Sequence, residues 1–155
     1  MTIYKWGNMV IGIIGESCTG KSSIANEISK RTGAKTYTGK DYMKLAKNEG
    51  EAINQFKDLL SQNESSDENT IYVITETEQM KFLPPKAIRV LMTADLGIIK
   101  DRFTKRMHGN LPPPVAAMLE KKHGMFGSIE NDLHIHNAGD EIKGICDEII
   151  NKCGL

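Results

Sequence analysis

The sequence predicts an α/β fold of three layers, in which helices cover both faces of a five-stranded, mostly parallel sheet. Two observations support this fold class. Short apolar runs rich in β-branched residues alternate along the chain with segments of helical periodicity. The helical segments also provide the crossover connections that parallel strands require. The chain has 155 residues, enough for one hydrophobic core, and we expect a single domain over residues 1–155.

Five short segments have the composition and the flanking turns of buried strands. They are residues 9–14, 34–38, 71–74, 88–92 and 133–136. Apolar positions at helical spacing predict helices at residues 22–31, 41–47, 51–60, 95–107, 115–122 and 141–152. We expect a polar surface loop at 61–70 and a proline-rich break at 108–114. In the last helix, the side chains expected to point inward are Ile142, Ile145, Cys146, Ile149 and Ile150.

Charge and composition exclude several classes of function. Twenty Lys and Arg balance twenty Asp and Glu, so no overall positive field attracts nucleic acid, and we expect no nucleic-acid partner. The longest apolar run is too short to cross a bilayer, and the first residues lack the pattern of a signal peptide. We therefore expect a cytoplasmic protein without a membrane partner. The three cysteines and four histidines lack the spacing of a zinc site or a disulfide framework, and Cys146 and Cys153 are expected in the core.

The segment from Gly15 to Ser22 reads GESCTGKS and fits the phosphate-binding motif GxxxxGK[ST] at every fixed position. It follows a predicted strand and opens a predicted helix, where backbone N–H groups and the helix N-terminus attract anions. Lys21 would reach the β- and γ-phosphates of ATP, and the Ser22 hydroxyl would bind Mg²⁺. The residues expected to contact the nucleotide in this segment are Gly15, Glu16, Ser17, Cys18, Thr19, Gly20, Lys21, Ser22 and Ser23.

Acidic residues at two predicted strand ends are candidates for metal binding and catalysis. Glu76, or else Glu78, follows the third strand, where a second metal-site acid is expected, although both also fit a solvated loop. Asp41 follows the second strand and could orient or deprotonate an acceptor hydroxyl. Its alternative role is that of an acid at a helix N-terminus.

Two of the four arginines in the sequence, Arg102 and Arg106, are four residues apart on one predicted helix. They therefore share a helix face, just before the proline-rich break. The planar guanidinium suits phosphate better than an ammonium group does. We expect both arginines to contact phosphate during catalysis; the alternative is a solvated helix face.

Taken together, these features resemble the nucleoside-monophosphate kinase group of P-loop proteins, with adenylate and cytidylate kinases as the nearest members. The resemblance extends over about residues 9 to 153, and the P-loop is its specific part. It implies that Thr38, Gly39 and Asp41 face the acceptor, with Lys44 where these kinases often have arginine. It also implies a short mobile lid at about 102–115. The loop containing Asn137, Ala138 and Gly139 would pack against the donor base.

One departure from that family concerns the acceptor. The stretch with an arginine that adenylate kinases place after strand three is replaced by residues 75–79, TETEQ. Small P-loop kinases of metabolites share the architecture and are an alternative. The leading hypothesis is a phosphotransferase that moves the γ-phosphate of ATP to a small acceptor, with a nucleotide as first candidate. In that case Tyr42 could stack on its base and Gln79 could bind its edge. A small-metabolite or nucleoside kinase, or a non-catalytic ATP-binding module, is the alternative.

Overall fold

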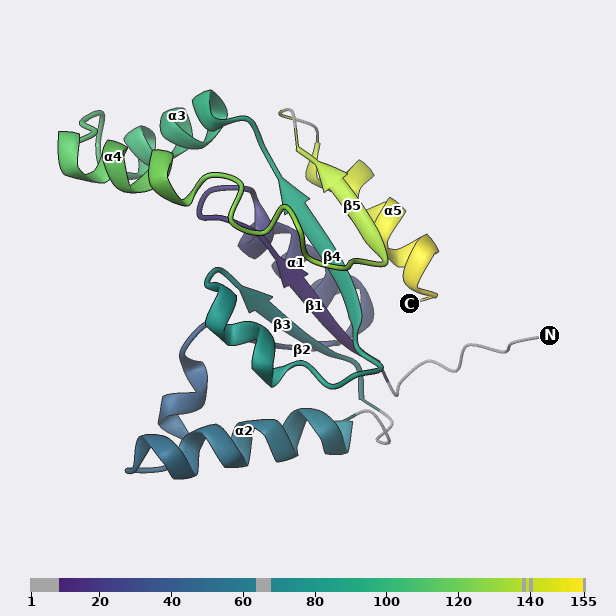
Figure 1. Cartoon of the computed structure of the whole chain (residues 1–155). Coiled ribbons are helices and arrows are strands. Elements are labelled where there is room, and N and C mark those ends of the chain that lie inside the picture. The colour runs from purple at the N-terminus through teal and green to yellow at the C-terminus, as the bar shows by residue number, and fades with distance from the viewer. Residues whose placement is uncertain (1–8, 64–67, 138, 140, 155) are drawn as a thin grey trace.

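In the computed structural model, the five strands form one sheet in the order β2-β3-β1-β4-β5 (Figure 1). All four pairs of neighbouring strands are parallel, which confirms the predicted α/β fold. The structure describes residues 9–63, 68–137, 139 and 141–154. The strands are β1 (Val10–Ile14), β2 (Lys35–Thr38), β3 (Thr70–Ile74), β4 (Ile88–Thr93) and β5 (Leu133–His136).

Helices connect the strands and cover the sheet. The α-helices are α1 (Lys21–Thr32), α2 (Glu49–Asn63), α3 (Leu96–Arg106), α4 (Pro113–Lys122) and α5 (Ile142–Cys153). Two short 3₁₀ helices follow strands β2 and β3, namely η1 (Asp41–Lys44) and η2 (Thr77–Phe82). Among the described residues, no helix combines the length and the apolar character needed to cross a membrane.

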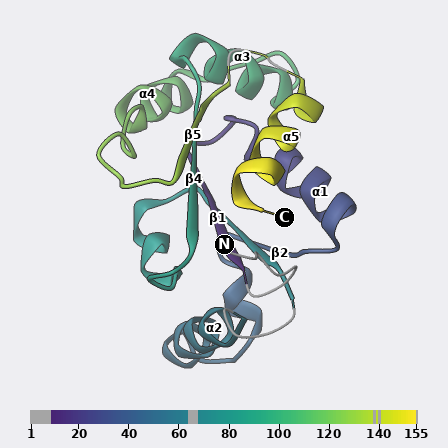
Figure 2. The same ribbon diagram turned by 90° about the vertical axis from the view of Figure 1, so that its right-hand side faces the viewer.

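One face of the sheet is covered by α1 and α5, which lie on the same side of it in Figure 2. Ile24 and Ile28 of α1 pack with Ile145 and Ile149 of α5 against the central strands. Cys146 and Cys153 are buried free thiols in or at the end of α5, as the sequence predicted. Ile142 is an exception to the predicted inward stripe, because it begins α5 beyond the edge of the core and is 45% exposed.

The opposite face is covered by α2, η1 and η2 through a cluster of aromatic side chains. These are Tyr37, Tyr42, Phe56, Tyr72 and Phe82. Phe56 is at the centre of the cluster and has no exposed surface. Tyr42 is also buried and stacks on Phe56. The expectation that Tyr42 stacks on a base is therefore wrong, because its ring is buried against α2 and is not accessible to a base.

Several predicted boundaries differ from the structure. Residues 61–63 continue helix α2, and Thr70 is a buried residue of β3, so the predicted loop at 61–70 is shorter than expected. The predicted helix at 41–47 is only the 3₁₀ helix η1. Helix α4 begins at Pro113, since proline lacks the N–H group that the first turn of a helix leaves unpaired anyway.

Helices α3 and α4 form an antiparallel pair beyond the carboxyl ends of the strands, beside the loop between β1 and α1 (Figure 1). Ile99 of α3 and Leu119 of α4 are buried in a small apolar cluster between them. A surface ion pair between Lys100 and Glu120 also joins the two helices. Residues 102–106 and 113–115 of the predicted lid are thus helical, and a turn at 107–112 separates them.

Candidate nucleotide-binding site

The segment that matches the phosphate-binding motif runs from the end of β1 to the start of α1, at the carboxyl edge of the sheet. The backbone N–H of Gly15 donates a hydrogen bond of 3.1 Å to the carbonyl oxygen of Ile74, at the end of β3. A Cβ atom on Gly15 would lie 2.3 Å from the carbonyl oxygen of Met92 in β4. Glycine is therefore required for the loop to leave the sheet between its two neighbouring strands.

The loop is held by hydrogen bonds within itself. The carbonyl oxygen of Glu16 accepts hydrogen bonds from Thr19 Oγ1 at 2.8 Å and from Lys21 Nζ at 2.5 Å. Gly20 is the N-cap of α1 with a φ of 94°, a left-handed conformation that glycine adopts without strain. Helix α1 thus begins at Lys21, and its N-terminal N–H groups form the end of the loop.

Lys21 is buried, with 5% of its surface exposed. Burial lowers the pKa of its ammonium group to about 8, because a charged group is less well solvated inside the protein. Nearby Cys18 and Glu16 act in the opposite direction, whereas the positive charge of Arg106 lowers the pKa further. The positive charge of this buried ammonium group is only partly balanced by neighbouring groups, so the site is well suited to bind an anionic phosphate.

Lys21 shares a cavity of about 110 Å³ with residues from other elements. Its lining includes Ser22, Ser23, Thr75 and Arg106. The donor set fits a Mg²⁺-bound phosphate: a hydroxyl group follows the lysine, and a second hydroxyl, that of Thr75, comes from the end of β3. No motif in the sequence marks Thr75. The only feature that could have indicated a role for Thr75 is its position, directly after a strand that neighbours β1.

A second cavity of about 270 Å³ adjoins the same loop. It is lined by Cys18, Gly20, Ser23, Ile24, Arg102, Arg106, Asn137 and Ile142. The structure thus brings together the predicted arginines and Asn137, and adds Ile142. Arg102 Nη1 donates a hydrogen bond of 3.0 Å to the Cys18 carbonyl, and Asn137 Nδ2 donates one of 3.1 Å to the Thr19 carbonyl. Ala138 lies outside the described residues.

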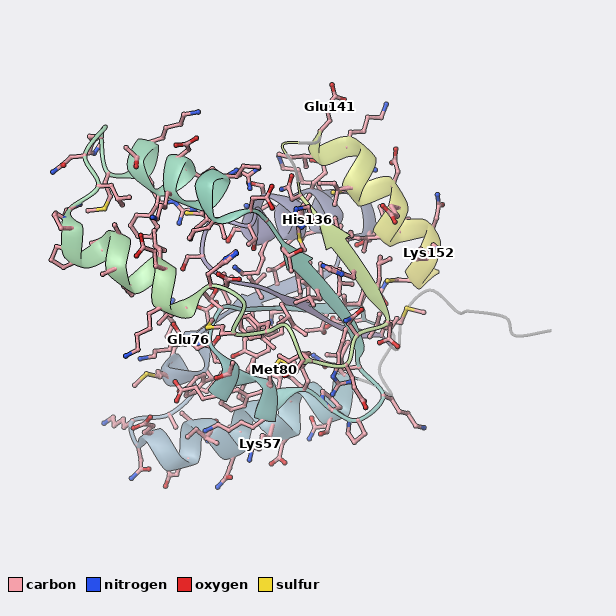
Figure 3. All side chains as sticks on the ribbon, turned by 45° about the horizontal axis from the view of Figure 1, so that its top comes forward. Lys57, Glu76, Met80, His136, Glu141 and Lys152 are labelled. Atoms are coloured by element: carbon pink, nitrogen blue, oxygen red, sulfur yellow. The ribbon has the colours of Figure 1, made fainter. Side chains whose placement is uncertain are left out.

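The two acidic candidates are both engaged by neighbouring groups. Asp41 Oδ2 accepts hydrogen bonds from the N–H and the hydroxyl of Thr38, at 2.8 and 3.1 Å. Glu76 forms an ion pair of 2.8 Å with Lys122 at the end of α4. Figure 3 shows Glu76 near this end of α4. Asp41 therefore stabilises the turn after β2, and a metal ion at Glu76 would compete with Lys122.

Gln79 is buried and shapes the same edge of the sheet. Its Oε1 accepts hydrogen bonds from the N–H groups of Thr75 and Glu76 at 3.1 and 3.2 Å. Its amide nitrogen lies near Gly39, whose carbonyl oxygen accepts a hydrogen bond of 2.7 Å from the hydroxyl of Tyr72. Gln79 therefore fixes the backbone where β3 ends, a role that its sequence position alone did not indicate.

Glu16 differs from the other residues of the loop, because its side chain contacts the segment after α4. Glu16 Oε1 lies 3.0 Å from His123 Nδ1, and Glu16 Oε2 accepts a hydrogen bond of 3.0 Å from the Gly124 N–H. We predicted nucleotide contact for Glu16. The structure shows that its carbonyl oxygen faces Lys21 while its carboxylate faces away, toward the end of α4.

The fold is that of small P-loop kinases. The chain is similar over 95% of its length to 96% of a tunicamycin resistance protein from Deinococcus radiodurans, with 16% identity and a TM-score of 0.67. It is similar over 97% of its length to 94% of a gluconokinase from Sinorhizobium meliloti 1021, with 11% identity and a TM-score of 0.63. It is similar over 92% of its length to 91% of a shikimate kinase from Acinetobacter baumannii, with 11% identity and a TM-score of 0.64. No family model and no curated protein sequence matches the chain.

Proposed function

We propose that the chain is a kinase that transfers the γ-phosphate of ATP to a hydroxyl group of a small acceptor. The observation that carries this proposal is the cavity that Lys21 shares with Ser22, Thr75 and Arg106. A lysine and an arginine that line one cavity suit a phosphoryl group that accumulates negative charge during transfer. The kinases among the structural neighbours, which include a gluconokinase and a shikimate kinase, support the same reaction class.

In the proposed reaction, the acceptor oxygen attacks the γ-phosphorus, the bond from phosphorus to the bridging oxygen of ADP breaks, and the hydroxyl proton passes to a base. Lys21 and Arg106 would stabilise the phosphoryl oxygens. The Ser22 hydroxyl would hold Mg²⁺, which neutralises phosphate charge when bound. Asp41 is our candidate for the base, and its Oδ2 is already oriented by Thr38.

The positions of the arginines favour a hydroxyl-bearing metabolite over a nucleoside monophosphate. All four arginines of the sequence lie in the described residues. Arg31 pairs with Glu27 and Asp147, and Arg89 bonds the Ala87 carbonyl near the start of β4. The other two arginines, Arg102 and Arg106, line the two cavities at the P-loop. If both contact the phosphates of ATP, no arginine remains for an acceptor phosphate, and a nucleotide acceptor would depend on exposed lysines such as Lys44.

A coupled assay of ADP release tests the proposal directly. The acceptor panel should contain sugars and sugar acids such as gluconate, cyclic hydroxy acids such as shikimate, nucleosides and nucleoside monophosphates, each with ATP and Mg²⁺. We expect one hydroxyl compound to stimulate ADP release well above the acceptor-independent rate. MgATP binding without stimulation by any acceptor class would instead favour a non-catalytic nucleotide-binding module.

A further inference from the structure

The carboxylate of Glu16 is the one acidic group that projects from the P-loop, and it is almost fully enclosed. The residue is 8% exposed, and the side chain 10%. Both carboxylate oxygens are used, Oε1 by His123 Nδ1 and Oε2 by the Gly124 N–H, each at 3.0 Å. Hydrogen bonds to an ionised and buried acceptor are stronger than those between neutral groups. The Glu16 carboxylate therefore connects the residues at the end of α4 to the loop.

A second set of contacts attaches the same pair of helices to the loop. Arg102 of α3 donates to the Cys18 carbonyl oxygen. The side chain of Cys18 is buried in the apolar cluster with Ile99 and Leu119, between α3 and α4. Cys18 has a φ of 63°, a left-handed conformation that is unusual for a residue other than glycine. The backbone is thus held in an unfavourable conformation at the point where the helix pair packs on it.

The same helix pair carries Arg106. Arg106 is the last residue of α3 and lines the cavity of about 110 Å³ together with Lys21. Among the described residues, Arg106 forms no hydrogen bond or ion pair with Glu16, so a link between the two would run through α4 and the apolar cluster between the helices. We propose that Glu16 is a positioning residue, which holds the α3–α4 pair against the P-loop so that Arg106 faces the bound phosphates. This inference rests on the proposed function only as far as nucleotide binding.

The backbone of Glu16 adds a connection to the phosphate site itself. Its carbonyl oxygen accepts the hydrogen bond of Lys21 Nζ, which must turn toward a phosphate when one binds. The same residue therefore contacts the lysine through its carbonyl group and the helix pair through its carboxylate. Phosphate binding and the position of α4 are coupled through one residue of the loop, and such coupling is reciprocal.

The test measures MgATP binding by titration calorimetry in the wild-type protein and in an Arg106→Ala background. In the wild-type background, Glu16→Ala should weaken MgATP binding by about tenfold, the scale of one charge-assisted hydrogen-bond pair. Glu16→Gln should restore most of that loss, because an amide oxygen can still accept from Gly124. His123→Ala, which lies outside the loop, should weaken binding by about threefold. Asp101→Asn is the matched control, since it removes an exposed carboxylate of α3 that forms no hydrogen bond or ion pair with the described residues.

In the Arg106→Ala background, Glu16→Ala should weaken MgATP binding less than twofold, because the arginine it positions is gone. Hydrogen exchange in residues 113–124 should also increase in Glu16→Ala and not in Asp101→Asn. Equal losses in the two backgrounds would overturn the inference, and so would unchanged binding in both Glu16→Ala and His123→Ala. Should Glu16→Ala fail to fold, the comparison of His123→Ala in the two backgrounds decides the same question. A wild-type protein that binds no MgATP would overturn the proposed function as well.

Discussion

The ammonium group of Lys21 donates a hydrogen bond of 2.5 Å to the backbone carbonyl oxygen of Glu16, five residues earlier in the same loop. A carbonyl dipole compensates only part of the cost of burying a positive charge. The lowered pKa of Lys21 reflects this imbalance. The loop therefore contains a buried positive charge that the protein neutralises only in part, and a bound phosphate anion would neutralise it.

Lys21→Met should reduce the rate of phosphoryl transfer by at least about a hundredfold, the scale observed when one stabilising group is removed from a transition state. The fold should persist, because methionine fills a similar volume and removes a buried charge. Steady-state kinetics with the acceptor found in the screen, together with far-UV circular dichroism, check both parts. Substantial turnover in the folded variant would contradict the assignment of Lys21.

The pKa of Lys21 also predicts how stability depends on pH. The folded-state pKa is about 8, against an ordinary value of 10.5, so between these values the unfolded chain binds more protons at this group. The free energy of unfolding should therefore gain a contribution that rises with pH from about 8 to about 10.5. Denaturant titrations at pH 7.5 and 9.5 on the protein without nucleotide measure it. The difference between the two pH values should be smaller in Lys21→Met; an identical difference would contradict the lowered pKa.

Ser22→Ala should weaken nucleotide binding in the presence of Mg²⁺ much more than in its absence. The reason is that the hydroxyl directly after the lysine is placed to bind the metal. Titration calorimetry with ATP, with Mg²⁺ and with a chelator, separates the two contributions. Ser22→Thr is the control, since it keeps a hydroxyl at the same position. If Ser22→Ala loses affinity equally under both conditions, the hydroxyl contacts the nucleotide and not the metal.

Gly15→Ala should destabilise the protein by about 1–3 kcal/mol, the usual cost of forcing an additional methyl group into a packed site. The new Cβ would lie 2.3 Å from the Met92 carbonyl oxygen, a backbone atom that cannot move independently of β4. Gly144→Ala is the matched control, because it lies within α5 with nothing within 4 Å of its Cβ position. It should stabilise the protein by roughly 0.5–1 kcal/mol. Denaturant unfolding of both variants distinguishes the two effects.

The fold class and the shape of the loop from Gly15 to Ser22 were predictable because each depends on short stretches of sequence. Strand β1 is an uninterrupted apolar run in which every residue is buried, and the glycines and the lysine of the loop stand at motif spacing. Arg102 and Arg106 were predictable for a similar reason, since helical periodicity alone places them on one face.

Contacts between distant parts of the chain were not predictable in this way. Glu16 and His123 are 107 residues apart, and nothing local to either one indicates the other. Tyr42 follows a polar turn, yet Phe56 of α2 and Phe82 of η2 enclose its ring. The side chains of Glu16 and Tyr42 are thus directed by tertiary packing, which a single sequence does not reveal.

Asp41 is the candidate base of the proposed reaction. Asp41→Asn should lower kcat for a hydroxyl acceptor by about a hundredfold or more and change the acceptor KM little, because an amide cannot take the proton but occupies the same volume. The complication is that Asp41 Oδ2 also stabilises the turn after β2, through the N–H and hydroxyl of Thr38. A loss of activity alone would not separate a base from a residue that shapes the turn.

Thr38→Val separates these roles, because it removes the hydroxyl hydrogen bond and leaves the carboxylate in place. If Asp41 is the base, Thr38→Val should retain most of kcat, and Asp41→Asn should lose the limb of the pH–rate profile that depends on an ionised carboxylate. If Asp41 only supports the turn, Asp41→Asn should instead keep most of kcat and the wild-type pH profile, and Thr38→Val should raise the acceptor KM. Since an asparagine oxygen can still accept the hydrogen bond from the Thr38 N–H, the turn should survive in Asp41→Asn, and its pH profile then reports on the proton transfer.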